Sequence, residues 1–165
     1  MRSNAMSSAQ RNETAVAQVL QFLSFTIGKE EYAVDIMKVR EIRGWEETTA
    51  LPNSLEYMRG VVNLRGAVVP IFDLKSRFGF GTTDVNRKNV VIVLAFGEHT
   101  IGILVETVSD ILSARQDEIR PAPKGGTAID VAYVQGIIPR DKKNMVILLD
   151  VEHLFDEKTL EAAAG

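Results

Sequence analysis

Short runs of alternating apolar and polar residues, separated by turn residues, dominate the chain. In the first run Leu23, Phe25 and Ile27 share one face, and Gly28 then opens a turn. Four runs form the arms of two candidate hairpins: 21–27 with 32–36, and 90–96 with 101–105. Period-two alternation bounded by turns is typical of half-buried strands. The pattern therefore predicts two β-hairpins.

These two hairpins belong to an internal repeat. Residues of matching character recur at a constant offset of 69 between the pairs Gly28/Gly97, Tyr32/Ile101, Ala33/Gly102, Val39/Val108 and Ile42/Ile111. Downstream, segment 57–62 matches 133–138, and 71–74 matches 148–151. A strand-rich unit of about 70 residues thus occurs twice. The glycine-rich, polar segment 79–88 reads as the seam between its copies.

The repeat predicts a mostly β fold made of two small five-stranded barrels. Five short strands in so few residues favour a closed barrel, because closure removes exposed sheet edges. Each copy alone would bury a marginal core, so the two are expected to pack together as one folding unit. We place the domain at 19–155, with a first barrel at about 19–85 and a second at about 86–153.

Helix signals are few. Residues 73–78, followed by Gly79, have the acidic start and glycine stop of a short helix. Residues 150–155 are the counterpart, and 156–165 is expected to be the end of a C-terminal helix or a tail. At the other end, Ser-Asn-Ala before Met6 resembles a cloning scar, and 1–18 is interpreted as scar and flexible tail.

Composition narrows the functions that the chain can have. The chain has 165 residues and a formal charge of −3, and it contains no cysteine. Disulfides, thiolate zinc sites and cysteine nucleophiles are therefore excluded. The two histidines, His99 and His153, lie far apart in the sequence, and no phosphate-binding or nucleophile-elbow motif occurs. The sequence offers no assembled active site, and we expect no catalytic residue, cofactor or metal.

The most informative segment is a predicted tight hairpin turn, Asn63-Leu64-Arg65-Gly66, between two apolar arms. Asn and Gly supply the conformations that such a turn needs. Arg65 either points into water or presents its five fixed donors to a partner. The matching turn of the second repeat, 139–144, is longer and different in detail. This asymmetry favours a role for the first tip that its counterpart lacks.

These residues, taken in order, closely resemble the CheW family of bacterial chemotaxis coupling proteins. The resemblance is carried by 21–28, by Val39–Arg43, by the Asn-Leu-Arg-Gly element with its flanking arms, and by 69–74, and it extends over roughly 19–155. Such proteins have two intertwined SH3-like barrels and no catalytic activity. They link membrane-embedded chemoreceptors to the histidine kinase CheA, whose regulatory domain has the same fold.

Carried over by position, the resemblance implies a receptor-binding surface. Its residues are Val39, Glu41, Gly60, Asn63 and Arg65. The same comparison implies binding to the methyl-accepting receptor tip and to the CheA regulatory domain. It implies a cytoplasmic location, peripheral to the membrane receptor arrays, without nucleic-acid binding or membrane insertion. The kinase-binding residues stay unassigned.

Two other functions are compatible with parts of the pattern. The chain could be a CheW-like regulatory module of a larger or non-chemotaxis signalling system. Alternatively, a small barrel could bind nucleic acid, but that requires a basic face studded with aromatic residues. A slightly acidic chain with 7% aromatic residues argues against the second alternative.

Overall fold

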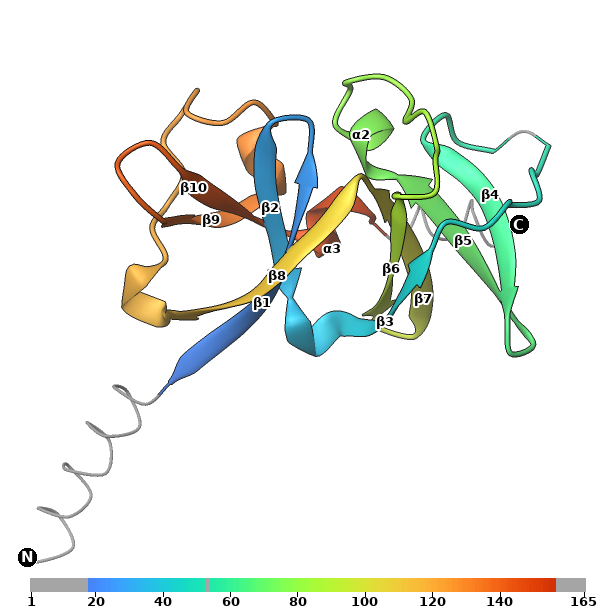
Figure 1. Ribbon diagram of the computed structural model, residues 1–165, viewed down its shortest axis with the longest axis horizontal. Helices are drawn as coiled ribbons and strands as arrows, with labels where there is room; N and C mark the ends of the chain where they lie inside the picture. Colours follow the sequence, from blue (N-terminus) through green and yellow to red (C-terminus); the bar gives the residue numbers. More distant parts are fainter. Residues whose placement is uncertain (1–17, 53, 157–165) are drawn as a thin grey trace, which may run out of the picture.

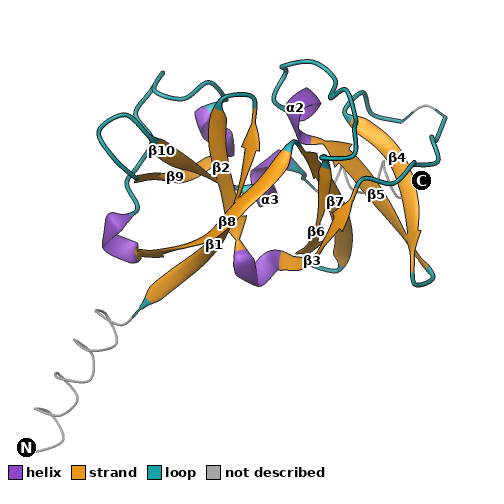
Figure 2. Cartoon of the chain, in the orientation of Figure 1, coloured by secondary structure: helices purple, strands orange, loops and turns teal. Residues whose placement is uncertain are grey.

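The computed structural model describes residues 18–52 and 54–156, which form two curled five-stranded sheets lying side by side (Figure 1). Sheet A has the strand order β8-β1-β2-β10-β9, and sheet B has the order β3-β6-β7-β5-β4. The helices are short and lie at the ends of strands (Figure 2). This confirms the expected mostly β fold with two five-stranded units.

The elements follow one another with short connections. In chain order they are β1 (Val19–Ile27), β2 (Glu30–Asp35), η1 (Ile36–Lys38), β3 (Val39–Gly44), β4 (Met58–Leu64), β5 (Ala67–Asp73), α2 (Leu74–Arg77), β6 (Val90–Phe96), β7 (His99–Val105), β8 (Thr107–Arg115), η2 (Gln116–Glu118), η3 (Val131–Tyr133), β9 (Val134–Pro139), β10 (Met145–Leu149) and α3 (Val151–Leu154). Apart from residues 18 and 156, the expected N-terminal tail and C-terminal helix end lie outside the described residues.

The two sheets are related by the sequence repeat. Strands β1 to β5 of the first repeat correspond in order to β6 to β10 of the second. If each strand in the order of sheet A is replaced by its counterpart, the order of sheet B results. Each sheet therefore takes a two-strand hairpin from one repeat and three strands from the other. The chain crosses between the sheets twice in the same manner, from β2 to β3 and from β7 to β8.

This exchange changes the expected division of the chain. A boundary near residue 85 separates the two copies of the repeat, but it does not separate the sheets. Sheet A contains β1 and β2 from before that boundary and β8, β9 and β10 from after it. The reason is physical: corresponding strands carry the same apolar pattern, so a hairpin can complete the sheet of either copy.

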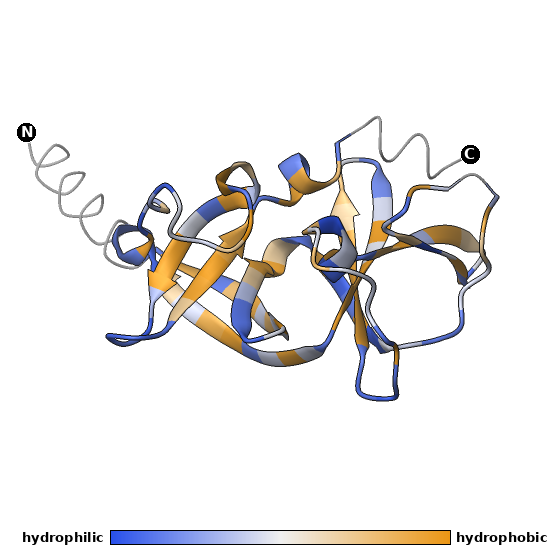
Figure 3. Cartoon of the chain, turned by 90° about the horizontal axis from the view of Figure 1, so that it is seen from above, coloured by the Kyte–Doolittle hydropathy of each residue, from blue (hydrophilic) through white to orange (hydrophobic). Residues whose placement is uncertain are grey.

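Alternation along the strands sends neighbouring side chains into different cores. In β1, Phe22 points into a small core inside sheet A, whereas Leu23 and Phe25 enter the large core shared by both sheets. Sheet B encloses a second small core that includes Val69 and Val91. Apolar residues concentrate in the strands, while peripheral turns are mostly polar (Figure 3). The shared core makes the two sheets interdependent.

Both predicted helices are present, and both begin at a capping aspartate. The Asp73 carboxylate accepts a hydrogen bond from Ser76 N at the start of α2, and Asp150 caps α3 in the same way through His153 N. Asp73 is buried, and Thr83 satisfies it further through its N–H and its hydroxyl. In the part of the chain that the structure describes, no helix is long and apolar enough to cross a membrane.

Candidate docking site at the open seam of sheet B

The tip of the β4–β5 hairpin is a two-residue turn with an unusual backbone. Arg65 and Gly66 both have positive φ, at 52° and 89°, as a type I′ turn requires. Asn63 Oδ1 accepts a hydrogen bond from Gly66 N at 2.9 Å. Among the described residues, Arg65 is the one non-glycine residue in this conformation. Such positions are costly for a side chain bearing a Cβ, and they often mark functional sites.

Arg65 is tethered across the sheet's unpaired edges. Its Nη2 lies 2.9 Å from Oε2 of Glu41, which stands on β3. Strands β3 and β4 are the two edge strands of sheet B, so this ion pair spans the seam between them. The Arg65 side chain is 79% exposed whereas that of Glu41 is 22% exposed. The guanidinium is therefore held in place yet open to a partner.

The tether continues along β3 as a chain of alternating charges. Glu41 Oε1 lies 3.3 Å from Arg43 Nη1, and Arg43 Nη2 lies 2.7 Å from Oε1 of Glu46. Hydrogen bonds from Arg65, and more weakly from Arg43, lower the pKa of the Glu41 carboxyl. Glu46 and Glu41 raise the pKa of Arg43. We call Glu41, Arg43, Glu46 and Arg65 the seam charges.

Two of the seam charges, Arg43 and Glu46, border an apolar hollow at the open edge of sheet B. Its cavity volume is about 10 Å³, close to the minimum that holds one water molecule. Arg43 and Glu46 form its polar rim, and five apolar side chains line it: Val62, Leu64, Ile71, Val91 and Val93. A hollow of this size does not accommodate a substrate or cofactor.

Gly60 has a structural role that is separate from the seam charges. Its φ is +136°, and a Cβ built there would lie 2.5 Å from the carbonyl oxygen of Thr49. Thr49 and Val61 form a β-bridge at this point, which helps to close sheet B. The counterpart Gly136 is crowded in the same way by Ile119 and by the Arg120 carbonyl. At both positions another segment of the chain approaches the edge strand so closely that there is no room for a Cβ.

The five predicted site residues thus separate into groups. The structure brings Glu41 and Arg65 into contact, and Asn63 shapes the turn that carries Arg65. Gly60 lies further along β4, and Val39 packs against the shared core instead of joining the seam charges. Sequence reasoning missed Arg43 and Glu46. Period-two alternation along β3 places Arg43 on the face of Glu41, and that signal could have found it.

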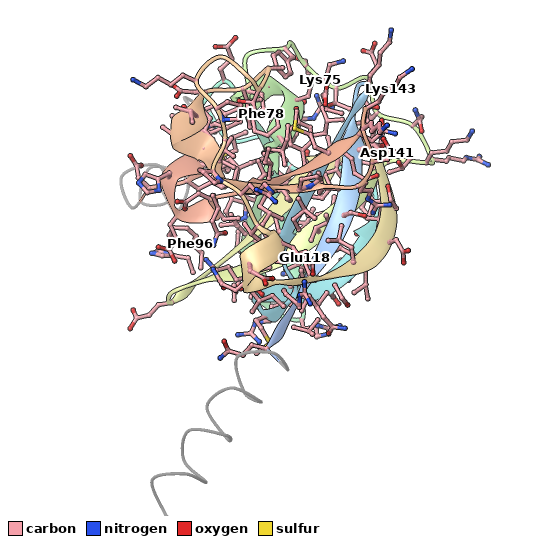
Figure 4. All side chains as sticks on the ribbon, turned by 90° about the vertical axis from the view of Figure 1, so that its left-hand side faces the viewer. Lys75, Phe78, Phe96, Glu118, Asp141 and Lys143 are labelled. Carbon is pink, nitrogen blue, oxygen red and sulfur yellow. The ribbon has the colours of Figure 1, made fainter. Side chains whose placement is uncertain are left out.

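The matching hairpin tip of sheet A is built differently. Its loop is closed by Asp141, which accepts hydrogen bonds from the N–H groups of Lys143 and Asn144 and from the Asn144 side chain. These bonds lower the pKa of Asp141. Figure 4 shows Asp141 and Lys143 together at this tip. Arg140 pairs with Glu31 on β2 at 2.8 Å, so this tip is anchored to a central strand and not to an edge strand.

No cluster of ionisable groups suited to a metal is present in 18–52 and 54–156, where three or more His, Asp or Glu side chains never converge. His153 instead pairs with the capping carboxylate of Asp150, at 2.6 Å.

Comparison with known proteins gives the family. Residues 21–159 match the family model of the CheW-like domain. This chain belongs to the CheW family. It is 43% identical over 143 residues to a probable chemotaxis protein CheW of Rhizobium etli, covering 87% of this chain and 92% of that protein. It is 41% identical to the chemotaxis protein CheW of Klebsiella aerogenes, covering 85% and 84%.

A solved structure of the family shares the fold. The scaffolding protein TtCheW of Thermoanaerobacter tengcongensis superimposes with a TM-score of 0.77 at 30% identity, over 86% of this chain and 91% of that one. The family assignment makes this chain a non-enzymatic CheW scaffold that couples chemoreceptors to the kinase CheA in chemotaxis. The expected family, fold class and function are confirmed.

Proposed function

We propose that the seam of sheet B, with Arg65 at its centre, is the surface through which this CheW-family scaffold binds the signalling tip of a methyl-accepting chemoreceptor. The observation that carries the proposal is the strained, exposed and tethered conformation of Arg65. A turn that stores backbone strain to present one guanidinium is poorly explained by stability alone.

The chemistry of the contact follows from the donors of Arg65. One of its amino groups faces Glu41, and the exposed remainder offers fixed N–H donors to acceptors on a partner. A carboxylate or the free carbonyls at the tip of a helical hairpin supply such acceptors. Because Glu41 already holds the side chain, little rotamer entropy is lost when the receptor binds.

The regulatory domain of CheA is proposed to bind a different surface of the same domain, so that both partners attach at once. Simultaneous binding lets a change in receptor conformation bias the kinase, provided that the contacts differ between the two receptor states. We propose that the protein acts in the cytoplasm, at the periphery of membrane receptor arrays. The folding unit that carries both surfaces is 19–155.

A matched pair of arginine variants tests the receptor surface. Arg65→Ala is expected to weaken binding to a receptor signalling-tip fragment by about tenfold or more, equivalent to about 1.4 kcal/mol. Arg140→Ala removes the arginine of the other hairpin tip and is expected to leave this affinity unchanged. Both variants should still co-elute with the CheA regulatory domain. Normal receptor binding by Arg65→Ala would reject the assignment.

A further inference from the structure

Half of the strand pairings in the described residues join one repeat to the other. They are β1 with β8, β2 with β10, β3 with β6, and β5 with β7. The remaining pairings are hairpins within a repeat. Each repeat therefore completes its sheets only by pairing with the other one. This is the topology of a strand-exchanged dimer contained in one chain.

A single covalent connection joins the two repeats. It runs as a loop from α2 to β6 (Figure 1). Its first part is fixed to the first repeat, because Thr83 donates from N and Oγ1 to Asp73 at 2.7 and 2.6 Å. Its last part is fixed to the second repeat, where Asn89 Nδ2 donates to the carbonyls of Val105 and Glu106. Only 84–88 lies between these anchors.

The connection turns back on itself through contacts within its own residues. Asn86 N donates to Asn89 Oδ1 at 2.6 Å, and Asn89 N donates to Asn86 O at 3.1 Å. Lys88 N donates to Asn86 Oδ1 at 2.7 Å. This turn aims the second repeat at the first repeat of the same chain. An extended connection would direct it elsewhere.

We propose that this chain also pairs with a second copy of itself, by extending the 86–89 turn and exchanging its second repeat. Every pairing between repeats then re-forms between chains with the same residues and the same register, so the exchange needs no new interface. The monomer is favoured by the high effective concentration of two repeats on one chain, and the dimer by protein concentration during folding. The dimer presents each docking surface twice.

The absence of cysteine from the sequence allows a direct test. Thr26 on β1 and Thr107 on β8 are cross-strand partners from different repeats, with hydroxyl oxygens 2.6 Å apart. One chain carries Thr26→Cys and another carries Thr107→Cys. The two are refolded together from denaturant at low and at high concentration, oxidised, and analysed by mass spectrometry of the cross-linked peptides.

A disulfide joining positions 26 and 107 of different chains is expected after refolding at high concentration, in an amount that rises with concentration. Mixing the two folded chains without denaturant should give none, because exchange requires unfolding. A chain carrying both substitutions is the control for geometry, since it should close its own disulfide after dilute refolding. If this control closes and the two-chain disulfide is absent at every concentration, the proposal is overturned.

Two changes in the turn give a second, independent measurement. Replacing 86–88 by three prolines removes the Asn86 and Lys88 N–H donors and favours an extended connection, so the dimer fraction measured by light scattering should rise several-fold. Inserting eight Gly and Ser residues after Arg87 should give monomer only. A folded triple-proline variant that stays monomeric contradicts the proposal. If that variant does not fold, the two-chain disulfide decides.

Discussion

Arg77 donates a hydrogen bond from Nε to the carbonyl oxygen of Leu154, 2.8 Å away. Leu154 occupies the position in the second repeat that Arg77 occupies in the first. The guanidinium carbon of Arg77 also lies 4.9 Å from the ring centre of Tyr57 and 4.8 Å from that of Tyr133, two further counterparts. Contacts between counterparts mark the approximate two-fold axis that relates the repeats. One arginine therefore joins both halves of the domain at this axis.

Replacing this arginine should loosen the junction. Arg77→Met keeps an apolar stem but removes two cation–π contacts and a charge-assisted hydrogen bond, so we expect a loss of about 1–3 kcal/mol in the free energy of unfolding. The exposed Arg87→Met, in the connection between repeats, is the control. Urea unfolding should stay a single transition with an unchanged slope. A loss below about 0.5 kcal/mol would show that the junction is dispensable.

The closely packed glycine of β4 should resist even the smallest substitution. Gly60→Ala places a methyl group 2.5 Å from the Thr49 carbonyl and strains a φ of +136°. Gly97→Ala also has a positive φ but meets open space. We expect Gly60→Ala to lower the free energy of unfolding by at least about 2 kcal/mol more than Gly97→Ala does. Its melting temperature should be correspondingly lower. Equal losses would mean that backbone conformation alone matters.

Tyr32 carries a buried hydroxyl without a hydrogen-bond partner among the described residues. Its ring stacks with that of Phe25 and lies tilted against that of Phe78 in the shared core. Because Tyr32→Phe removes an unsatisfied polar group and keeps the ring, stability should be unchanged or rise by about 1 kcal/mol. A clear loss of stability would indicate that the hydroxyl has a partner after all.

The same tyrosine predicts a pH dependence. Burial, aided by the charge of Glu30, raises the pKa of Tyr32 to about 12 from an ordinary value of 10.0. The contribution of the neutral Tyr32 side chain to folding stability is fully present below pH 10 and is lost as the pH rises toward 12. The loss occurs because the tyrosine ionises at a lower pH in the unfolded chain than in the folded one. Over that window the wild type should lose up to about 1.4 kcal/mol per pH unit more than Tyr32→Phe. The measurement is the free energy of unfolding of both proteins as a function of pH. If it falls equally in the two proteins over this window, the raised pKa of Tyr32 is contradicted.

Glu41 should act on receptor binding through Arg65. Glu41→Gln removes the charge that holds the guanidinium across the seam, and it should weaken receptor binding less than Arg65→Ala does. A variant carrying both Glu41→Gln and Arg65→Ala should lose less receptor affinity than the sum of the two single losses, since both substitutions disrupt the same ion pair. Affinities measured for all four proteins complete the cycle. Strict additivity would show that Glu41 contacts the receptor independently of Arg65.

The local elements of this protein were determined by the sequence itself. Alternation at Leu23 and Phe25 predicted a strand, Asp73 followed by Gly79 predicted a short helix, and Asn63-Leu64-Arg65-Gly66 predicted a tight turn. The internal repeat was also visible. These signals are short-range, because they depend on which face a side chain occupies and on which backbone angles a residue allows.

Only the tertiary structure decided which strands pair. Both repeats carry the same pattern, so the sequence did not distinguish pairing within a copy from pairing between copies, and the sheets turned out to mix the two. The contact of Glu41 with Arg65 depends on curling sheet B until its edge strands meet. The contact of Arg77 with Leu154 depends on the axis between the repeats. Neither distance is encoded in a local pattern, because each arises from packing two apolar faces against a shared core.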